Sequence, residues 1–144
     1  TDLGGQFGRE LVYLGHAAAL KDDLTATENL QTACLLGGMA VTQAQARDAL
    51  AGAGLPTRWR VPARQLSQGQ RRRVALARLL LCRQVPLWVL VEPFNALDAT
   101  ATDWLCSVIS RHLDAGGLVV LTSHQDVALD TLADRLVPLV LGGA

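Results

Sequence analysis

The run Leu66-Ser67-Gln68-Gly69-Gln70 stands directly before an apolar, arginine-bearing stretch with helical spacing. A helix N-terminus carries backbone N–H groups without intrahelical partners and the positive end of the helix dipole, so it can hold a phosphate group. The apolar run Leu87–Val91 follows as a predicted buried strand, and it ends in the carboxylate of Glu92. Together the two features predict an α/β domain that handles a nucleotide.

The charge balance argues against a nucleic-acid partner. Thirteen basic and thirteen acidic side chains cancel in a chain of 144 residues, half of which are hydrophobic. The longest basic run is the triplet Arg71-Arg72-Arg73, which we interpret as a solvated helix face. Because nucleic-acid binding needs a clustered basic surface, no DNA or RNA partner is expected. The apolar content is enough for a sizeable core within one domain or part of one.

Cysteine spacing and the length of the apolar runs restrict the class of protein further. Cys34, Cys82 and Cys106 are odd in number and widely separated, which is not typical of zinc or redox sites and favours a reducing cytoplasm. No apolar run approaches the roughly 20 residues that a membrane-spanning helix needs. Any membrane contact is therefore expected to come through a partner protein. The polar start at Thr1 suggests that the sequence is part of a longer protein.

Short apolar runs alternate with helical patterns, which predicts a parallel sheet with helices on both faces. Thr25, with Glu28 three residues later, is a predicted capping box. We divide the chain into a sheet core, 1–16 and 84–144, and a helical subdomain, 17–83. Strands are predicted at 10–14, 87–91, 118–122 and 135–141, and helices at 25–36, 42–51, 67–82, 100–113 and 126–133.

The motifs resemble those of the ATP-binding subunits of ABC transporters. Residues 66–70 are similar to the signature motif of that family, and we call them the signature segment. Glu92 with its preceding strand is similar to the Walker B segment, and Asn95-Ala96-Leu97-Asp98 to the D-loop. The segments 13–16, 24–30 and 121–126 narrow the resemblance to haem-exporter subunits of cytochrome c maturation.

The resemblance implies an ABC-type P-loop NTPase fold, here incomplete, with a parallel sheet core and a small helical subdomain. It implies ATP hydrolysis coupled to haem export, with ATP and Mg²⁺ as cofactors. The expected partners are a second ATP-binding subunit and the integral-membrane subunits of the exporter. The expected location is the cytoplasmic face of the bacterial inner membrane, as a peripheral protein.

Two residues at strand ends are the expected catalytic groups. A carboxylate at the end of a rigid strand can orient or deprotonate the attacking water, so Glu92 is the candidate general base. Its alternative is a surface carboxylate at a strand end. His124 follows the strand 118–122 and is, by resemblance, the switch histidine that hydrogen-bonds the γ-phosphate; its alternative is a solvated loop residue. His112 is expected on a helix surface.

The nucleotide-binding set consists of the signature segment, His16 and Asp98. By resemblance, the amides of Leu66, Ser67, Gln68, Gly69 and Gln70 face a nucleotide held by a second subunit. His16 stands where most of the family carries the Q-loop glutamine, and a capping or loop histidine is the alternative. Asp98 would lie at the dimer seam. Ser67 and Asp98 are also plausible N-caps, and each can combine both roles.

Two features depart from a working ATPase of this family. The pattern G-x-x-x-x-G-K-[ST], which holds the β- and γ-phosphates, does not occur in these 144 residues, where Lys21 is the sole lysine. Val91 stands where the Walker B aspartate would hold Mg²⁺ through water, and no residue of this chain is assigned as a metal ligand. We therefore expect a C-terminal portion, truncated or degenerate, that cannot bind ATP-Mg alone.

Three alternatives stay open at this point. The same ATPase module could serve another cargo, because the membrane subunits choose the cargo. A degenerate ABC-like domain could fold and dimerise as a regulatory scaffold without hydrolysis, for which Val91 is the best indication. An ABC protein acting on DNA or ribosomes is disfavoured by the neutral charge balance.

Overall fold

The computed structural model describes residues 11–15 and 19–123. The three strands are β1 (Leu11–Leu14), β2 (Leu87–Val91) and β3 (Leu118–Thr122). The helices are α2 (Ala26–Leu36), α3 (Gln43–Gly52), the short 3-10 helix η1 (Ala63–Gln65), α4 (Gln68–Leu81) and α5 (Ala99–Asp114). The bounds agree with the sequence-based prediction to within one or two residues, and η1 is the element it missed. The predicted helix 126–133 and strand 135–141 lie outside the described residues.

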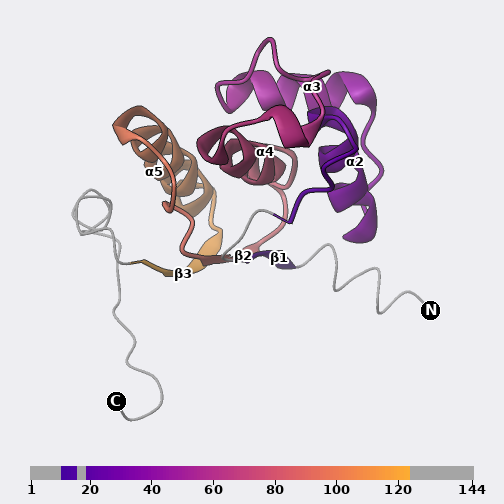
Figure 1. Ribbon diagram of the computed structural model, residues 1–144. Coiled ribbons are helices and arrows are strands. Elements are labelled where there is room, and N and C mark those ends of the chain that lie inside the picture. Colours follow the sequence, from indigo (N-terminus) through magenta and orange to yellow (C-terminus); the bar gives the residue numbers. More distant parts are fainter. Residues whose placement is uncertain (1–10, 16–18, 124–144) are drawn as a thin grey trace.

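The sheet is parallel, as predicted, with β2 between β1 and β3. Trp88 is aligned with Val12 on one side and with Val119 on the other. All the described helices lie on the same side of this sheet (Figure 1). The second helical layer that the alternating pattern predicts is not among the described elements. Because all three strands run in the same direction, their carboxyl ends meet at one edge, which is where Glu92 follows β2.

Side-chain caps fix where the helices begin. Thr25, Thr42 and Ser67 each form a complete capping box, in which the cap side chain and the third helical residue satisfy each other's backbone amides. Asp98 caps α5 by accepting a hydrogen bond from Ala101 N. The predicted capping box at Thr25 and the predicted N-cap roles of Ser67 and Asp98 are therefore confirmed. Each such cap contributes about 1 kcal/mol to helix stability.

Helix α4 is shared between two hydrophobic clusters. On one face, Leu76 and Leu79 pack against the sheet and α5, in a cluster centred on the fully buried Trp88. On the other face, Val74 and Ala77 pack against α2 and α3. The helix that begins at the signature segment is therefore the common wall between the sheet layer and helices α2 and α3. None of the described helices is both long and apolar enough to cross a membrane.

His112 is not a surface residue, and the prediction that it would be was wrong. It is 6% exposed, and its ring stacks on the indole of Trp88. The three cysteines are thiols buried in the core. The neighbouring Cys82 thiol, together with burial, raises the pKa of the Cys34 thiol.

Candidate functional site at the tip of helix α4

The signature segment forms the exposed start of α4. Ser67 Oγ accepts from Gln70 N at 3.1 Å, and Gln70 Oε1 accepts from Ser67 N at 2.9 Å. The side chain and the amide of Gln70 are therefore both used by the cap. Within the described part of the chain, the backbone amides of Gln68 and Gly69 have no acceptor. These two N–H groups, at the positive end of the helix dipole, can receive a phosphate oxygen.

The loop that leads into α4 is held against the start of α2. Ala26 N donates to Val61 O at 3.2 Å, and Ala63 N donates to Leu24 O at 2.9 Å. Arg71 ties this loop to its own helix, because its Nη1 donates to Ala63 O at 2.8 Å. The side chain of Leu66 is buried in the hydrophobic cluster that α4 forms with α2 and α3. Leu66 therefore anchors the signature segment by its side chain and can meet a ligand only through its backbone.

The same tip of α4 meets the D-loop. A Cβ placed on Gly69 would lie 3.1 Å from Ala96 O, which is tighter than ordinary van der Waals contact. Ala96 has a φ of 65°, in the left-handed region that few non-glycine residues adopt. Arg73 Nη2 reaches Asp98 Oδ1 at 3.3 Å, so a salt bridge also joins α4 to the cap of α5. The structure therefore brings together the signature segment, Ala96 and Asp98.

Glu92 is half-buried at the carboxyl end of β2, where its backbone is held by β3. Its amide donates to Thr122 O at 3.1 Å and to Thr122 Oγ1 at 3.0 Å. Its φ is 49°, so the chain leaves the strand through a strained conformation before the D-loop. Strained backbone at a strand end that is fixed by neighbouring strands is a common feature of functional sites. The position agrees with the predicted role of Glu92 as a carboxylate presented at this edge of the sheet.

Arg72 is the functional candidate that sequence reasoning missed, because the whole basic triplet was interpreted as a solvated face. Arg72 is 3% exposed, and it donates to Gly15 O, Val91 O and Glu92 O at 3.1, 3.3 and 2.9 Å. Burial lowers the pKa of its guanidinium. A signal was present in the sequence: helical spacing places Arg72 in line with Leu76 and Leu79, on the apolar face of α4.

Two predicted site residues cannot be compared with the structure. His16 and His124 lie outside the described residues, and their roles stay predictions. Described backbone reaches both neighbourhoods, since Gly15 precedes His16 and Ser123 precedes His124. Gly15 and Thr122 are joined to Glu92 through the contacts of Arg72 and of the Glu92 amide. The backbone that leads to both histidines is therefore anchored around Glu92.

The described residues do not fit a magnesium site. Val91 ends β2 with a hydrocarbon side chain where an aspartate would hold the metal through water. Among residues 11–15 and 19–123, no group of three or more His, Cys, Asp or Glu side chains is arranged to hold a metal ion. Mg²⁺ prefers carboxylates, phosphates and water as ligands. This part of the chain therefore offers two helix-start amides without described acceptors and the strand-end carboxylate of Glu92, but no set of metal ligands.

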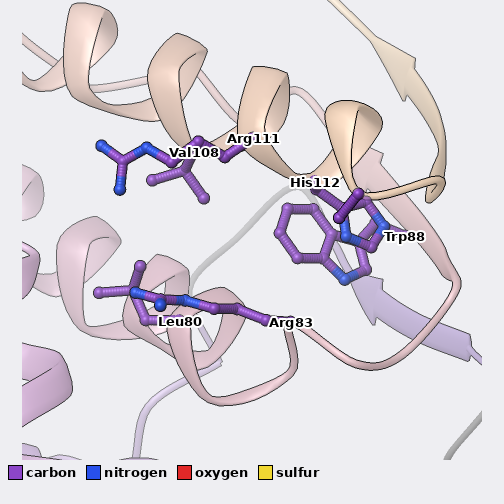
Figure 2. Close-up of a pocket in the computed structure, with 7 residues that line it drawn as sticks. Leu80, Arg83, Trp88, Val108, Arg111 and His112 are labelled. Carbon is purple, nitrogen blue, oxygen red and sulfur yellow. The ribbon is translucent and has the colours of Figure 1, made fainter.

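A separate cavity of about 130 Å³ lies at the opposite end of β2, close to where that strand begins. Trp88 and His112 form one wall, Leu80 and Val108 line the apolar part, and two arginines, Arg83 and Arg111, flank it (Figure 2). The cavity is apart from Glu92, because Trp88 is the second residue of β2 and Glu92 follows the last residue of that strand. It therefore belongs to the packing between α4 and α5.

Comparisons with known proteins agree with the motifs. A family model described as ABC transporter matches residues 3–95. Relatives from several bacteria carry the name cytochrome c biogenesis ATP-binding export protein CcmA. The protein of Nitrosospira multiformis is 50% identical over 88% of this chain and 61% of its own length. That of Aromatoleum aromaticum is 55% identical over 83% and 56%, and that of Paraburkholderia xenovorans 41% identical over 96% and 68%.

Solved structures share the fold. An ATP-binding cassette solved as a dimer in a post-hydrolysis state, bound to ADP and Pi, aligns with a TM-score of 0.75 and 23% identity. The alignment covers 88% of this chain and 57% of that structure. A dimeric bacterial ABC transporter cassette aligns with a TM-score of 0.72 over 85% of this chain. The chain spans about three fifths of the length of the relatives that it matches.

Proposed function

This chain belongs to the ABC transporter family, and we propose that it supplies the signature segment and the catalytic carboxylate of an ATP-hydrolysing export subunit. By the names of its relatives, the export step serves cytochrome c biogenesis. The cargo proposed from the motifs is haem, and the proposed partners are a second ATP-binding subunit and integral-membrane subunits. The proposed location is the cytoplasmic face of the bacterial inner membrane.

One observation carries this proposal: the amides of Gln68 and Gly69 project from an exposed helix start without an acceptor. A γ-phosphate brought by a facing subunit would accept hydrogen bonds from these two N–H groups. The positive end of the helix dipole complements the negative charge of that phosphate. Ser67 and Gln70 hold the helix start in place by the capping box, so the amides are oriented before the phosphate arrives. Asp98, held by Arg73, lies beside this tip at the proposed dimer seam.

Glu92 acts in the nucleotide site of its own subunit. Its carboxylate accepts a proton from, or orients, the water that attacks the γ-phosphate in line with the leaving group. The bonds from its amide to Thr122 fix the strand end from which the carboxylate projects. His124, two residues after Thr122, is the proposed hydrogen-bond partner of the same phosphate. Each subunit therefore contributes a carboxylate to one site and helix amides to the other.

ATP hydrolysis by the full gene product tests the proposal. Replacing Glu92 by Gln keeps the size of the side chain and removes the base, so kcat is expected to fall by about 10²-fold or more. Asp103→Asn is the matched control, because Asp103 is an exposed carboxylate on α5, away from the strand ends. Equal hydrolysis by the wild type and E92Q would remove Glu92 from the reaction.

A non-hydrolysing, ABC-like regulatory subunit is the second candidate, and Val91 is the observation that favours it. Without the aspartate that holds the metal, the site can bind and dimerise around nucleotide without turnover. Measuring nucleotide-dependent dimerisation alongside hydrolysis separates the two functions. Dimerisation with ATP and no turnover in the wild-type full gene product supports the scaffold, whereas turnover that E92Q abolishes supports the export ATPase.

A further inference from the structure

Arg72 is a buried cation without a carboxylate partner in the described part of the chain. The buried polar and charged residues there are Thr27, Asn29, Arg72 and His112, and of these only Arg72 carries a permanent charge. The described salt bridges involve Arg64, Arg71 and Arg73, but not Arg72. Removing a charge from water costs several kcal/mol even after the protein relaxes. An apolar side chain in this place would serve packing alone better than an arginine.

Three carbonyl oxygens take up the guanidinium instead. Gly15 follows the end of β1, Val91 ends β2, and Glu92 is the first residue after β2. The shortest of the three bonds, 2.9 Å, goes to Glu92 O, which also accepts from Asn95 N at 3.1 Å. Arg72 Nε makes no hydrogen bond to any described residue. The terminal nitrogens therefore bridge two neighbouring strand ends at the edge where nucleotide chemistry is proposed.

The other end of this connection is the signature segment. Arg72 lies four residues after Gln68 on α4, about one helical turn from the two amides without acceptors. A shift of α4 along its axis when a phosphate docks on these amides would move the guanidinium, and with it the carbonyl of Glu92. Because Glu92 has a φ of 49°, its backbone conformation depends on such external restraint.

We propose that Arg72 is a positioning residue that ties the orientation of Glu92 to the state of the signature segment. This inference rests on the proposed function, since it assigns the coupling within that site. Lysine cannot replace it, because a single ammonium does not span three carbonyls on two strands as the planar, forked guanidinium does. Arg72 touches neither water nor phosphate in this role, and it acts only through the backbone of Glu92 and Gly15.

Arg72→Lys and Arg72→Gln in the full gene product test the coupling. Arg83→Gln is the matched control, because Arg83 is an exposed arginine two residues after the end of the same helix. Misplacement of a catalytic group by about 1 Å costs on the order of 10²-fold in rate. We therefore expect both Arg72 variants to lose about 10- to 100-fold in kcat, with KM for ATP changed less than about twofold. R83Q is expected to keep the kcat and KM of the wild type.

Hydrogen exchange gives a readout that does not depend on turnover. In R72Q, the Asn95 amide, which donates to Glu92 O, is expected to exchange faster, while the Ala46 amide in α3 keeps its rate. The proposal is overturned if kcat is unchanged in both variants or if the exchange rate at Asn95 is unchanged. It is also overturned if both variants fail to fold, because Arg72 would then be a stability residue. If the wild type and E92Q hydrolyse ATP equally, the proposed function fails, and the exchange at Asn95 still decides whether Arg72 positions this backbone.

Discussion

The imidazole of His112 lies flat against the indole of Trp88, with ring centroids 3.7 Å apart and planes inclined by 4° (Figure 2). A His112 ring nitrogen is 3.2 Å from Pro86 O, and Trp88 Nε1 donates to Cys82 O at 3.2 Å. The stack therefore fastens the last turn of α5 and the end of α4 to the start of β2. Glu92 follows the other end of this strand. The stack therefore fixes, from the far end, the strand that leads to the proposed catalytic carboxylate.

Gly117→Ala is predicted to destabilise the protein through this stack. A Cβ on Gly117 would overlap three atoms of the His112 ring, which is confined between Trp88 and the chain at Gly117. Overpacking of this kind costs about 1–3 kcal/mol. Urea-induced unfolding followed by tryptophan fluorescence measures the loss, and an unchanged midpoint would contradict the packing described.

A double-mutant cycle with His112→Ala isolates the cause. Once the ring is removed, Gly117→Ala should cost much less than in the wild type, so the two effects should not add. Gly116→Ala is the control, because Gly116 has a φ of 93° and nothing lies within 4 Å of a Cβ placed there. Its cost comes from backbone strain and is expected to be the same with and without His112.

Local sequence patterns predicted the described elements well, for a physical reason. The capping boxes at Thr25 and Ser67 depend on residues only three positions apart, so they can be recognised without tertiary information. The strand 87–91 is an uninterrupted apolar run because it lies in the middle of a parallel sheet. The fold class follows from this alternation of strands and helices.

The burial of His112 and Arg72 could not be predicted in the same way, because each depends on residues distant in sequence. His112 is buried by Trp88, 24 positions earlier, and Arg72 by carbonyls at Gly15 and Glu92. Arginine is mostly exposed in folded proteins and histidine is seldom fully buried, so residue type alone favours the wrong interpretation. The sequence indicates their burial only through helical spacing, which places Arg72 on the apolar face of α4 and His112 on that of α5. The close approach of Gly69 to Ala96 O cannot be predicted from local sequence patterns either, since it joins α4 to a turn after β2.

Ser67→Asp is predicted to separate stability from function. Aspartate is as good an N-cap as serine, and its negative charge interacts favourably with the positive end of the helix dipole. The free energy of unfolding should therefore change by less than about 0.5 kcal/mol. The same charge repels a phosphate approaching Gln68 N and Gly69 N, so ATP hydrolysis by the full gene product should fall by at least about tenfold.

Ser67→Ala and Ser67→Thr complete the set for thermal melting and ATP turnover. Alanine removes the cap and should cost about 1 kcal/mol of stability, whereas threonine keeps the hydroxyl and should preserve both stability and turnover. If S67D hydrolysed ATP at the rate of S67T, the α4 amides would not face a phosphate.

Gly69→Ala is predicted to weaken turnover without weakening the fold. Alanine in the first turn of a helix gains about 0.5–1 kcal/mol over glycine, which offsets the close approach of its Cβ to Ala96 O. The contact must open by a few tenths of an ångström, which moves α4 relative to the D-loop. We expect an unchanged or slightly raised melting temperature and a several-fold lower kcat in the full gene product.

Gln68→Ala serves as its control, because Gln68 is exposed at the preceding helical position and the substitution leaves the backbone amide in place. It should leave kcat within about twofold of the wild type. Equal kcat values in G69A and Q68A would indicate that the close approach of Gly69 to Ala96 does not affect ATP turnover.

Val91→Asp is predicted to lower the Mg²⁺ concentration that the full gene product needs for ATP hydrolysis. Val91 ends β2 on the face opposite Trp88 and Leu90, the face that no described helix covers, so a carboxylate there can stay hydrated. The lost apolar contact should cost about 1–2 kcal/mol of stability. The Mg²⁺ concentration that supports half-maximal ATP hydrolysis should fall by about tenfold.

Val91→Asn is the control for this prediction. It removes the same apolar surface without adding charge, so it should show the stability cost alone. A titration of ATP turnover with MgCl₂ compares the three proteins, and superimposable curves for V91D and V91N would show that position 91 does not approach the metal.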